Sequence, residues 1–349
     1  MKITRVSKPI SRTPPSLLTH RQLYVYPIKA LRGIELKRAD LGAQGIRHDR
    51  RFMLFRVLEN GDLKKMQLSE VPECALFEQE IAGDESIVVR FHRPASSPRP
   101  ADRVPQTPLS VPLYPETEGL ETVEIDLHGS SARVYRMGDE YSSWFSACFG
   151  YEVVFVYIGN GRRPVLGSTL PPQPAPQQRG WLSGVTSYLT GTSQQDSTWL
   201  TFTDVAPLMV TTEASLRNVR ARISDSPEAV DMYKFRPNIV IDGEDEWAED
   251  FWAELTVNGG DRLLLTANCL RCTSLNVDYD TGRPAAGEVG TVLKKLMKDR
   301  RVDKGHKWSP VFGRYAFLAD ERGFEVSVGD AVDVTGRLKE RTTWDWPGL

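Results

Sequence analysis

The first half of the chain alternates apolar and polar positions in the way that half-buried β-strands require. Strands are predicted over residues 22–29, 52–58, 86–91, 122–127 and 153–158. Asn60-Gly61, just after the second of these runs, is a strong hairpin signal. Asp139 is expected to cap a short helix through Trp144 and Phe145. We therefore predict a strand-rich, barrel-like N-terminal domain over residues 21–158.

The second half begins near Trp199 and mixes short strands with short helices. Thr212 is placed to cap a helix that starts at Glu213 and runs to about Arg222. Further helices are expected over residues 246–252 and 288–300, and strands over residues 238–241, 263–266, 273–277, 315–318 and 331–334. Short strands interrupted by short helices predict a β-barrel with helical decoration over residues 199–337.

Three segments fall outside these two domains. Residues 159–198 are rich in Pro, Gln, Gly, Ser and Thr and read as a linker, and residues 338–349 as a C-terminal tail. Residues 1–20 are predicted to form a flexible basic N-terminus, and their basic and hydroxyl residues are also typical of a mitochondrial transit peptide. Pro9, Pro14 and Pro15 interrupt any amphipathic helix there and favour a disordered tail.

Composition narrows the class of protein. The net charge of −2 gives no general electrostatic footprint for nucleic acid, so an anionic ligand needs a local basic cluster. No apolar run is long enough to be a transmembrane segment. Four cysteines in 349 residues do not make a disulfide framework, so we expect an intracellular protein, cytoplasmic or mitochondrial.

Cys269 and Cys272 are the centre of the candidate chemistry, and the pair has four interpretations. A zinc site needs about four ligands, but Cys74 and Cys148 are isolated. A thioredoxin-like pair belongs at a helix start, whereas a strand is predicted after Cys272. The pair is otherwise two buried structural thiols, or a single soft thiolate for a transition metal that Arg271 helps to ionise. The pair alone does not decide between them.

Cationic residues recur at the edges of apolar strands in three separate stretches, residues 26–30, 45–54 and 235–240. Each stretch alone is typical of a solvated charge or of an ion pair, such as Asp49 with Arg50. Together they offer cations from distant parts of the chain, as a folded anion pocket would. The planar fork of arginine suits phosphate because it donates two parallel hydrogen bonds.

The ordered series of these motifs resembles the MOSC-domain family, named for the C-terminal domain of molybdenum cofactor sulfurases. Within it the chain looks most like the mitochondrial amidoxime-reducing component and its bacterial relatives. The similarity covers most of residues 22–336. Its motifs are Tyr-Pro-Ile-Lys at 26–29, Asp-Arg-Arg-Phe-Met-Leu at 49–54, Phe-Arg-Pro-Asn-Ile-Val at 235–240, Cys-Leu-Arg-Cys at 269–272 and Ser-Pro-Val-Phe-Gly at 309–313.

The resemblance implies an α+β, mainly β fold, with a strand-rich MOSC-N domain followed by a MOSC β-barrel that carries short helices. It also implies a molybdenum-pterin cofactor (molybdopterin), with Cys272 as the catalytic metal ligand. The matching cofactor contacts are Lys29, Arg50, Arg236, Asn238, Arg271 and Cys272. Relatives often have hydroxyl residues where this chain has Ala30, Val205 and Ala206, so some side-chain donors to the cofactor are expected to be missing.

The resemblance further implies an enzyme that reduces small N-oxygenated, N-hydroxylated substrates. The sequence has no nicotinamide or flavin fingerprint, so electrons are expected from a cytochrome b5-type donor and its reductase. One alternative is sulfur transfer, because sulfurases carry a similar domain behind a pyridoxal phosphate desulfurase that this chain is too short to include. Another is a cofactor carrier or structural β-barrel without reductase activity.

Overall fold

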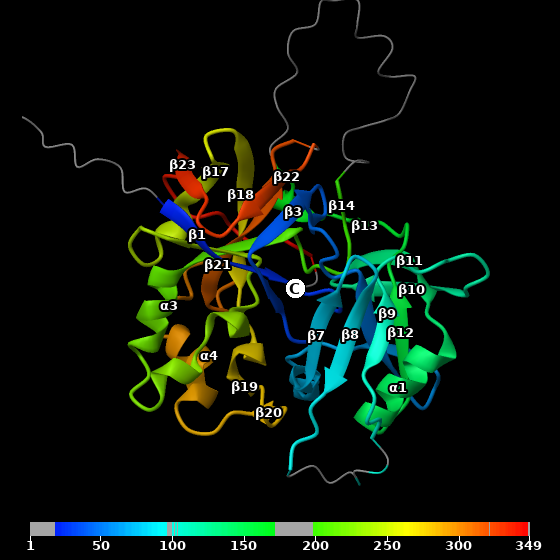
Figure 1. Cartoon of the computed structure of the whole chain (residues 1–349). Helices are drawn as coiled ribbons and strands as arrows, with labels where there is room; N and C mark the ends of the chain where they lie inside the picture. The colour runs from blue at the N-terminus through cyan, green and yellow to red at the C-terminus, as the bar shows by residue number, and fades with distance from the viewer. Residues whose placement is uncertain are drawn as a thin grey trace, which may run out of the picture.

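The computed structural model describes residues 18–95, 100, 102, 104–171, 198–320 and 322–347, and its two strand-rich halves lie side by side (Figure 1). Most of the basic N-terminus and most of the linker predicted over residues 159–198 lie outside the described residues. No helix in the described part of the chain is long and apolar enough to cross a membrane.

The N-terminal half contains two antiparallel sheets, ordered β10-β11-β12-β5-β6 and β7-β8-β9. Their strands are β5 (Phe52–Val57), β6 (Leu63–Lys65), β7 (Phe77–Ala82), β8 (Ser86–Phe91), β9 (Leu109–Pro112), β10 (Thr122–Leu127), β11 (Ser130–Arg136) and β12 (Val153–Tyr157). The predicted turn at Asn60-Gly61 joins β5 to β6. Helix α1 (Asp139–Phe149) packs on β12, but Gly138 is its N-cap, and Asp139 lies in its first turn.

A closed barrel forms the C-terminal half. Within the described residues its strand order is β16-β15-β21-β18-β17-β23-β1, closed because β16 also pairs with β1. These strands are β1 (Leu18–Val25), β15 (Leu208–Thr212), β16 (Ile239–Asp242), β17 (Trp252–Val257), β18 (Asp261–Leu270), β21 (Val311–Leu318) and β23 (Ala331–Arg337). Every strand contributes buried apolar residues to one cluster, for example Leu23, Ile239 and Leu255, which fills the barrel.

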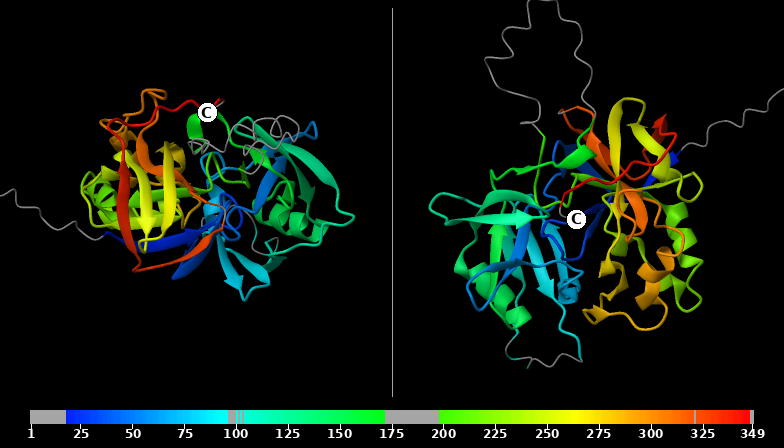
Figure 2. Two further views of the ribbon diagram at one scale, coloured as in Figure 1. Left: turned by 90° about the horizontal axis from the view of Figure 1, so that it is seen from above. Right: turned by 180° about the vertical axis from the view of Figure 1, so that it is seen from behind.

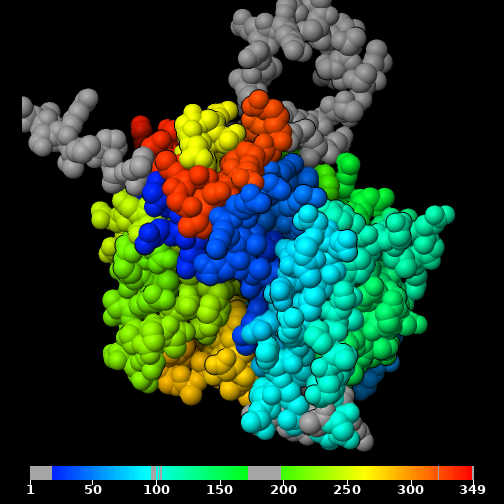
Figure 3. Space-filling model, in the orientation of Figure 1, coloured from blue at the N-terminus to red at the C-terminus, as the bar shows by residue number. Residues whose placement is uncertain are grey.

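The first strand of the chain therefore belongs, by its hydrogen bonds, to the barrel of the second half. After it, β2 (Ile34–Leu36) extends the barrel sheet, and β3 (Arg38–Gly42) pairs with β4 (Gly45–Ile46) and β22 (Phe324–Ser327). In Figure 3 the blue N-terminal residues lie along the seam between the orange C-terminal residues and the cyan N-terminal sheets. Strands from the first half of the chain thus pair with strands of the second half. The domain boundaries given above stay a prediction.

Three helices predicted in the second half are present but shorter than predicted. Helix α3 (Glu213–Arg220) starts as predicted, with Thr212 accepting from the Ser215 backbone N–H at 3.1 Å. The helix predicted over residues 288–300 is only η9 (Val289–Thr291) and α4 (Val292–Leu296), and the Arg300 carbonyl accepts from the Val311 N–H at the start of β21. The helix predicted over residues 246–252 is the 3-10 helix η7 (Ala248–Phe251).

The strand predicted over residues 273–277 is wrong. The 3-10 helix η8 (Thr273–Asn276) follows Cys272 directly, and the short strand β19 (Val277–Asp278) comes after it and pairs with β20 (Arg283–Pro284). Burial of Leu275 in the core beside α4 outweighs the β-propensity of this segment. A turn lies between β19 and β20, where the Gly282 N–H donates to the Asp278 carbonyl.

Glu249 and Asp250 are fully buried, although their charge predicts exposure to solvent. The Asp250 carboxylate accepts two hydrogen bonds from Arg300, at 2.8 and 2.9 Å, and one from Arg341 at 2.7 Å. Glu249 accepts from the Thr212 hydroxyl, and burial raises its pKa to about 7. The pattern failed here because the partners of these acids lie far away in the sequence.

The predicted C-terminal tail packs against the body of the protein over residues 338–347. Trp344 and Trp346 are buried, and the Asp345 carboxylate accepts from the Ser168 backbone N–H at 2.8 Å. Viewed from behind, the red C-terminal segment runs back from the barrel to the line between the two halves (Figure 2). The C-terminal segment therefore contacts both halves.

Candidate functional site

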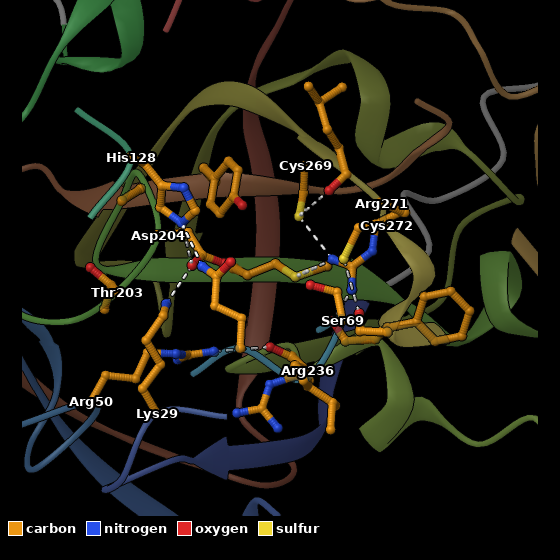
Figure 4. Close-up of a pocket in the computed structure, with 18 of the residues that line it drawn as sticks. Lys29, Arg50, Ser69, His128, Thr203, Asp204, Arg236, Cys269, Arg271 and Cys272 are labelled. Atoms are coloured by element: carbon orange, nitrogen blue, oxygen red, sulfur yellow. Dashed lines mark hydrogen bonds and ion pairs between the residues drawn. The ribbon is translucent and has the colours of Figure 1, made fainter. Parts of the chain in front are cut away.

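A cavity of about 270 Å³ lies between the two halves, close to the lower end of the usual range for small-molecule pockets. The structure brings all six predicted site residues to its wall: Lys29, Arg50, Arg236, Asn238, Arg271 and Cys272. They come from the β1–β2 connection, the start of β5, the segment before β16 and the end of β18. Figure 4 shows a cluster around Lys29 on one side of the cavity and the two cysteines on the other.

Lys29 defines the first side. Its ammonium pairs with the Asp204 carboxylate, and His128 Nε2 lies 3.4 Å from the same oxygen (Figure 4). Burial lowers the pKa of Lys29 to about 8, although the Asp204 charge opposes that shift. Burial opposes ionisation of Asp204 too, but Lys29 and His128 outweigh it and hold the Asp204 pKa well below its usual range. At neutral pH this side carries one ammonium and one carboxylate.

Two guanidinium groups, those of Arg50 and Arg236, lie against the Tyr26 ring, 4.5 and 4.4 Å from its centroid. Both arginines have left-handed backbones, with φ of 48° and 55°. Backbone contacts hold these turns, since the Arg50 N–H donates to the Tyr26 carbonyl and the Arg236 side chain donates to the Leu31 carbonyl at 2.7 Å. Asp49 neutralises Arg50, which leaves Arg236 as the guanidinium without an acidic partner among the described residues.

Asn238 has a supporting position. Its amide oxygen accepts from the Met209 backbone N–H at 3.1 Å, and its amide nitrogen donates to the Tyr24 carbonyl at 3.3 Å. The side chain is 1% exposed. Asn238 thus ties together β1, β15 and the segment before β16 behind the cavity, and its amide is already largely occupied by the backbone.

The two cysteines have different surroundings. Cys269 is buried in β18, its Sγ lies 2.9 Å from an Arg271 nitrogen, and burial raises its thiol pKa. Cys272 is exposed, and its Sγ lies 3.2 Å from the Ser274 hydroxyl. A strand predicted after Cys272 argues against a thioredoxin-like redox pair. Because a 3-10 helix follows Cys272 instead, that argument does not hold. The difference in exposure remains, and it favours separate roles for the two thiols.

Five polar atoms of cavity-lining residues are buried and have no hydrogen-bond partner in the described part of the chain. They are Arg236 Nη2, Arg271 Nε, Thr203 Oγ1, His128 Nδ1 and Trp344 Nε1. Buried polar groups normally have partners, so their concentration at one cavity indicates a polar ligand. Cationic donors suit a phosphate-bearing pterin, and an exposed thiolate suits molybdenum. The residues present therefore fit the implied cofactor.

The departures from the family pattern lie partly in the cavity wall. Ala30 and Ala206 line the cavity and offer only methyl groups, whereas Val205 is fully buried in the core. Polar contacts to a ligand on this wall therefore depend on the charged side chains and on the buried polar atoms without a partner.

Sequence reasoning missed several lining residues, notably Asp204, His128, Tyr315 and Trp344. His128 and Gly129 form the β10–β11 turn, both with positive φ, which the turn sequence indicates. No sequence signal shows that this turn reaches the cavity. Trp344 gave no signal either, because it follows the last recognisable strand.

Two family models match the chain in order. Residues 18–152 match the model described as "MOSC N-terminal beta barrel domain", and residues 197–333 match the "MOSC domain" model. The two matches confirm the predicted fold class and order of domains. The last residues of the described chain, including Trp344, lie beyond both matches.

Curated relatives cover most of the chain at low identity. Mitochondrial amidoxime-reducing component 1 of Homo sapiens is 25% identical over 322 residues, 91% of this chain and 83% of the relative, and its Mus musculus counterpart is 26% identical with the same coverage. The molybdenum cofactor sulfurase of Oryza sativa is 23% identical over 270 residues, 75% of this chain but 29% of the relative.

Proposed function

The chain belongs to the MOSC-domain family, and from that premise we propose that it is a molybdenum-cofactor oxidoreductase that reduces N-hydroxylated compounds. The observation that supports this proposal best is a single cavity whose wall carries cations from both halves, Lys29, Arg236 and Arg271, together with the exposed thiol of Cys272. The names of the amidoxime-reducing relatives support this activity rather than another.

Each residue has a role that its surroundings support. Lys29 and Arg236 bind the phosphate of the pterin, and Arg271 holds the cysteine turn because its side chain donates to the Phe235 carbonyl at 2.7 Å. Arg50 and Asn238 hold the cavity wall in shape through their backbone partners. Cys272 would ligate molybdenum, which when bound would supply the two-electron redox chemistry.

The electrons come from outside the chain in this proposal, from a cytochrome b5-type donor and its reductase. We place the protein inside the cell, in the cytoplasm or the mitochondrion, where the names of the relatives also point. The proposed domains are residues 21–158 and 199–337, although β1 pairs with strands of the second domain in the folded chain.

The test compares three forms of the protein expressed with a supply of the cofactor: wild type, Cys272→Ser and Cys269→Ser. We expect wild type to contain molybdenum and to reduce an aromatic amidoxime. Cys272→Ser should lose the metal or the activity, because serine is a poor ligand for a soft metal. Cys269→Ser is the matched control and should keep both. Soluble wild-type protein without molybdenum, measured by elemental analysis, overturns the proposal.

Sulfur transfer is the second candidate, and the sulfurase relative together with the exposure of Cys272 favours it over a purely structural role. A persulfide on Cys272, detected by mass spectrometry in protein that shows no reductase activity, would establish it in place of the reductase.

A further inference from the structure

Reduction of an N-hydroxylated compound consumes protons as well as electrons. The N–O bond breaks, two electrons enter from the donor protein, one added proton joins the departing hydroxyl to form water, and the other joins the nitrogen: R–NH–OH + 2e⁻ + 2H⁺ → R–NH₂ + H₂O. A side chain that gives a proton to the departing oxygen must therefore stand in the same cavity as Cys272. The following inference rests on the proposed function and names that side chain.

Most titratable groups of the cavity wall already have partners. Lys29 and His128 both contact Asp204, and Arg271 contacts Cys269. Burial raises the pKa of Tyr315 well above its usual range, so its phenol is a poor acid. Of the two histidines that line the cavity within the described residues, His306 is the one that does not contact Asp204.

The turn that carries His306 lies beside the cysteine segment. The Pro310 carbonyl accepts from the Arg271 backbone N–H at 2.8 Å, one residue before Cys272. In the same turn the Ser309 backbone N–H donates to His306 Nδ1 at 3.3 Å, and both residues line the cavity. His306 thus stands on the wall that holds the proposed metal ligand.

The Ser309 contact also fixes where the imidazole proton lies. Because Nδ1 accepts a hydrogen bond, the neutral ring carries its proton on Nε2. Nε2 has no partner among the described residues, and the ring is only partly buried. It is therefore free to donate in the cavity and to recover a proton from solvent.

Buried contacts make the turn rigid. The Asp303 carboxylate is 2% exposed and accepts from the backbone N–H groups of Gly305 and Trp344, at 2.8 and 2.9 Å. It also accepts from the Asn268 amide at 2.6 Å, next to Cys269 in β18. Gly305 lies so close to the Trp344 carbonyl that a Cβ would stand 1.8 Å from its oxygen. The position of His306 is thus set by β18 and by the C-terminal segment beyond both family matches.

We propose that His306 is the proton donor of the reaction, giving its Nε2 proton to the oxygen that leaves the substrate nitrogen. The second proton comes from solvent, which also reprotonates the ring.

The test measures how fast an aromatic amidoxime reoxidises the chemically reduced, molybdenum-loaded protein in a single turnover. His306→Gln and His306→Ala should slow this step by about a hundredfold. Molybdenum content should stay at the wild-type level, because His306 is not among the cofactor contacts. Added imidazole should restore part of the rate in His306→Ala. His92→Gln, an exposed histidine of the N-terminal half, is the matched control and should leave the rate unchanged.

Two results would overturn the inference while the proposed function stands: a rate within about twofold of wild type, or a loss of rate that only follows a loss of molybdenum. A loaded wild-type protein that reduces no N-hydroxylated compound would remove the proposed function itself, and the inference with it.

Discussion

Lys29 is a residue whose charge depends on its tertiary surroundings. The sequence places it at the end of a predicted strand, and the fold buries it beside Asp204 from the other half of the chain. Burial lowers its pKa to about 8, so its charge is lost slightly above neutral pH rather than near the usual value of 10.5. Anion binding in the cavity should therefore depend on pH.

We expect inorganic sulfate, whose own charge is constant in this range, to bind about tenfold more weakly at pH 9 than at pH 7. An anion favours charged Lys29, which predominates below the pKa and is lost above it. Calorimetric titration of the ligand-free protein measures the effect. Lys29→Met should bind weakly at both pH values. An equal pH slope in wild type and variant would contradict this origin.

Single residues were predictable where motif and chemistry agreed. Lys29, Arg236 and Cys272 stand in recognisable motifs, and all reach one cavity. Asp204 and His128 stand in no motif that states their role, because their function comes from mutual distance. Glu249 and Asp250 likewise could not be predicted from local sequence. Their charge favours exposure, but in the folded protein both are buried beside partners from distant segments.

At the scale of elements, the C-terminal segment departs most from its prediction. It reads as a tail after the last strand, yet Trp346 Nε1 donates to the His128 carbonyl at 2.7 Å, and both groups are buried. That bond holds a turn whose His128 has a φ of 62° and contacts Asp204 at the cavity. The segment thus links the barrel to the β10–β11 turn.

Trp346→Phe should lower the free energy of unfolding by about 1–3 kcal/mol, because it leaves the buried His128 carbonyl without its donor. Urea denaturation measures the change. Trp308→Phe is the control, since Trp308 is 75% exposed, and it should shift the value by less than about 0.5 kcal/mol. Equal effects of the two substitutions would show that the Trp346 bond contributes nothing.

Short elements were harder to predict than long ones. The helix at Glu213 was found through its cap, because Thr212 bonds within the helix it starts. The segment after Cys272 was assigned to a strand from its β-branched residues, but burial of Leu275 makes it a 3-10 helix. Four residues carry too little local preference to resist packing.

At the scale of the molecule, β1 joins the two halves. It lies between β16 and β23 in the barrel and leads directly to Lys29 at the cavity. Without it, both neighbours would present unpaired backbone groups, and the barrel core would be open on one side.

We therefore expect residues 199–349 alone to fail to fold cooperatively, whereas residues 18–349 unfold in one transition. Circular dichroism and tryptophan fluorescence should give coincident urea curves for the longer chain. The control adds residues 18–36 to the shorter chain through a flexible linker, which should recover a cooperative transition. A stable, cooperative 199–349 fragment would show that β1 is dispensable.

The sequence by itself determined the fold class, the order of the two domains and six of the residues that line the cavity, because strand periodicity and ordered motifs are local properties of the chain. Tertiary structure alone decided the sharing of β1, the pairing of Lys29 with Asp204 and the return of the C-terminal segment to the cavity wall. These features depend on hydrogen bonds and burial between residues far apart in the sequence, 41 and 218 positions apart for two bonds of the C-terminal segment. A local pattern carries no signal for such contacts.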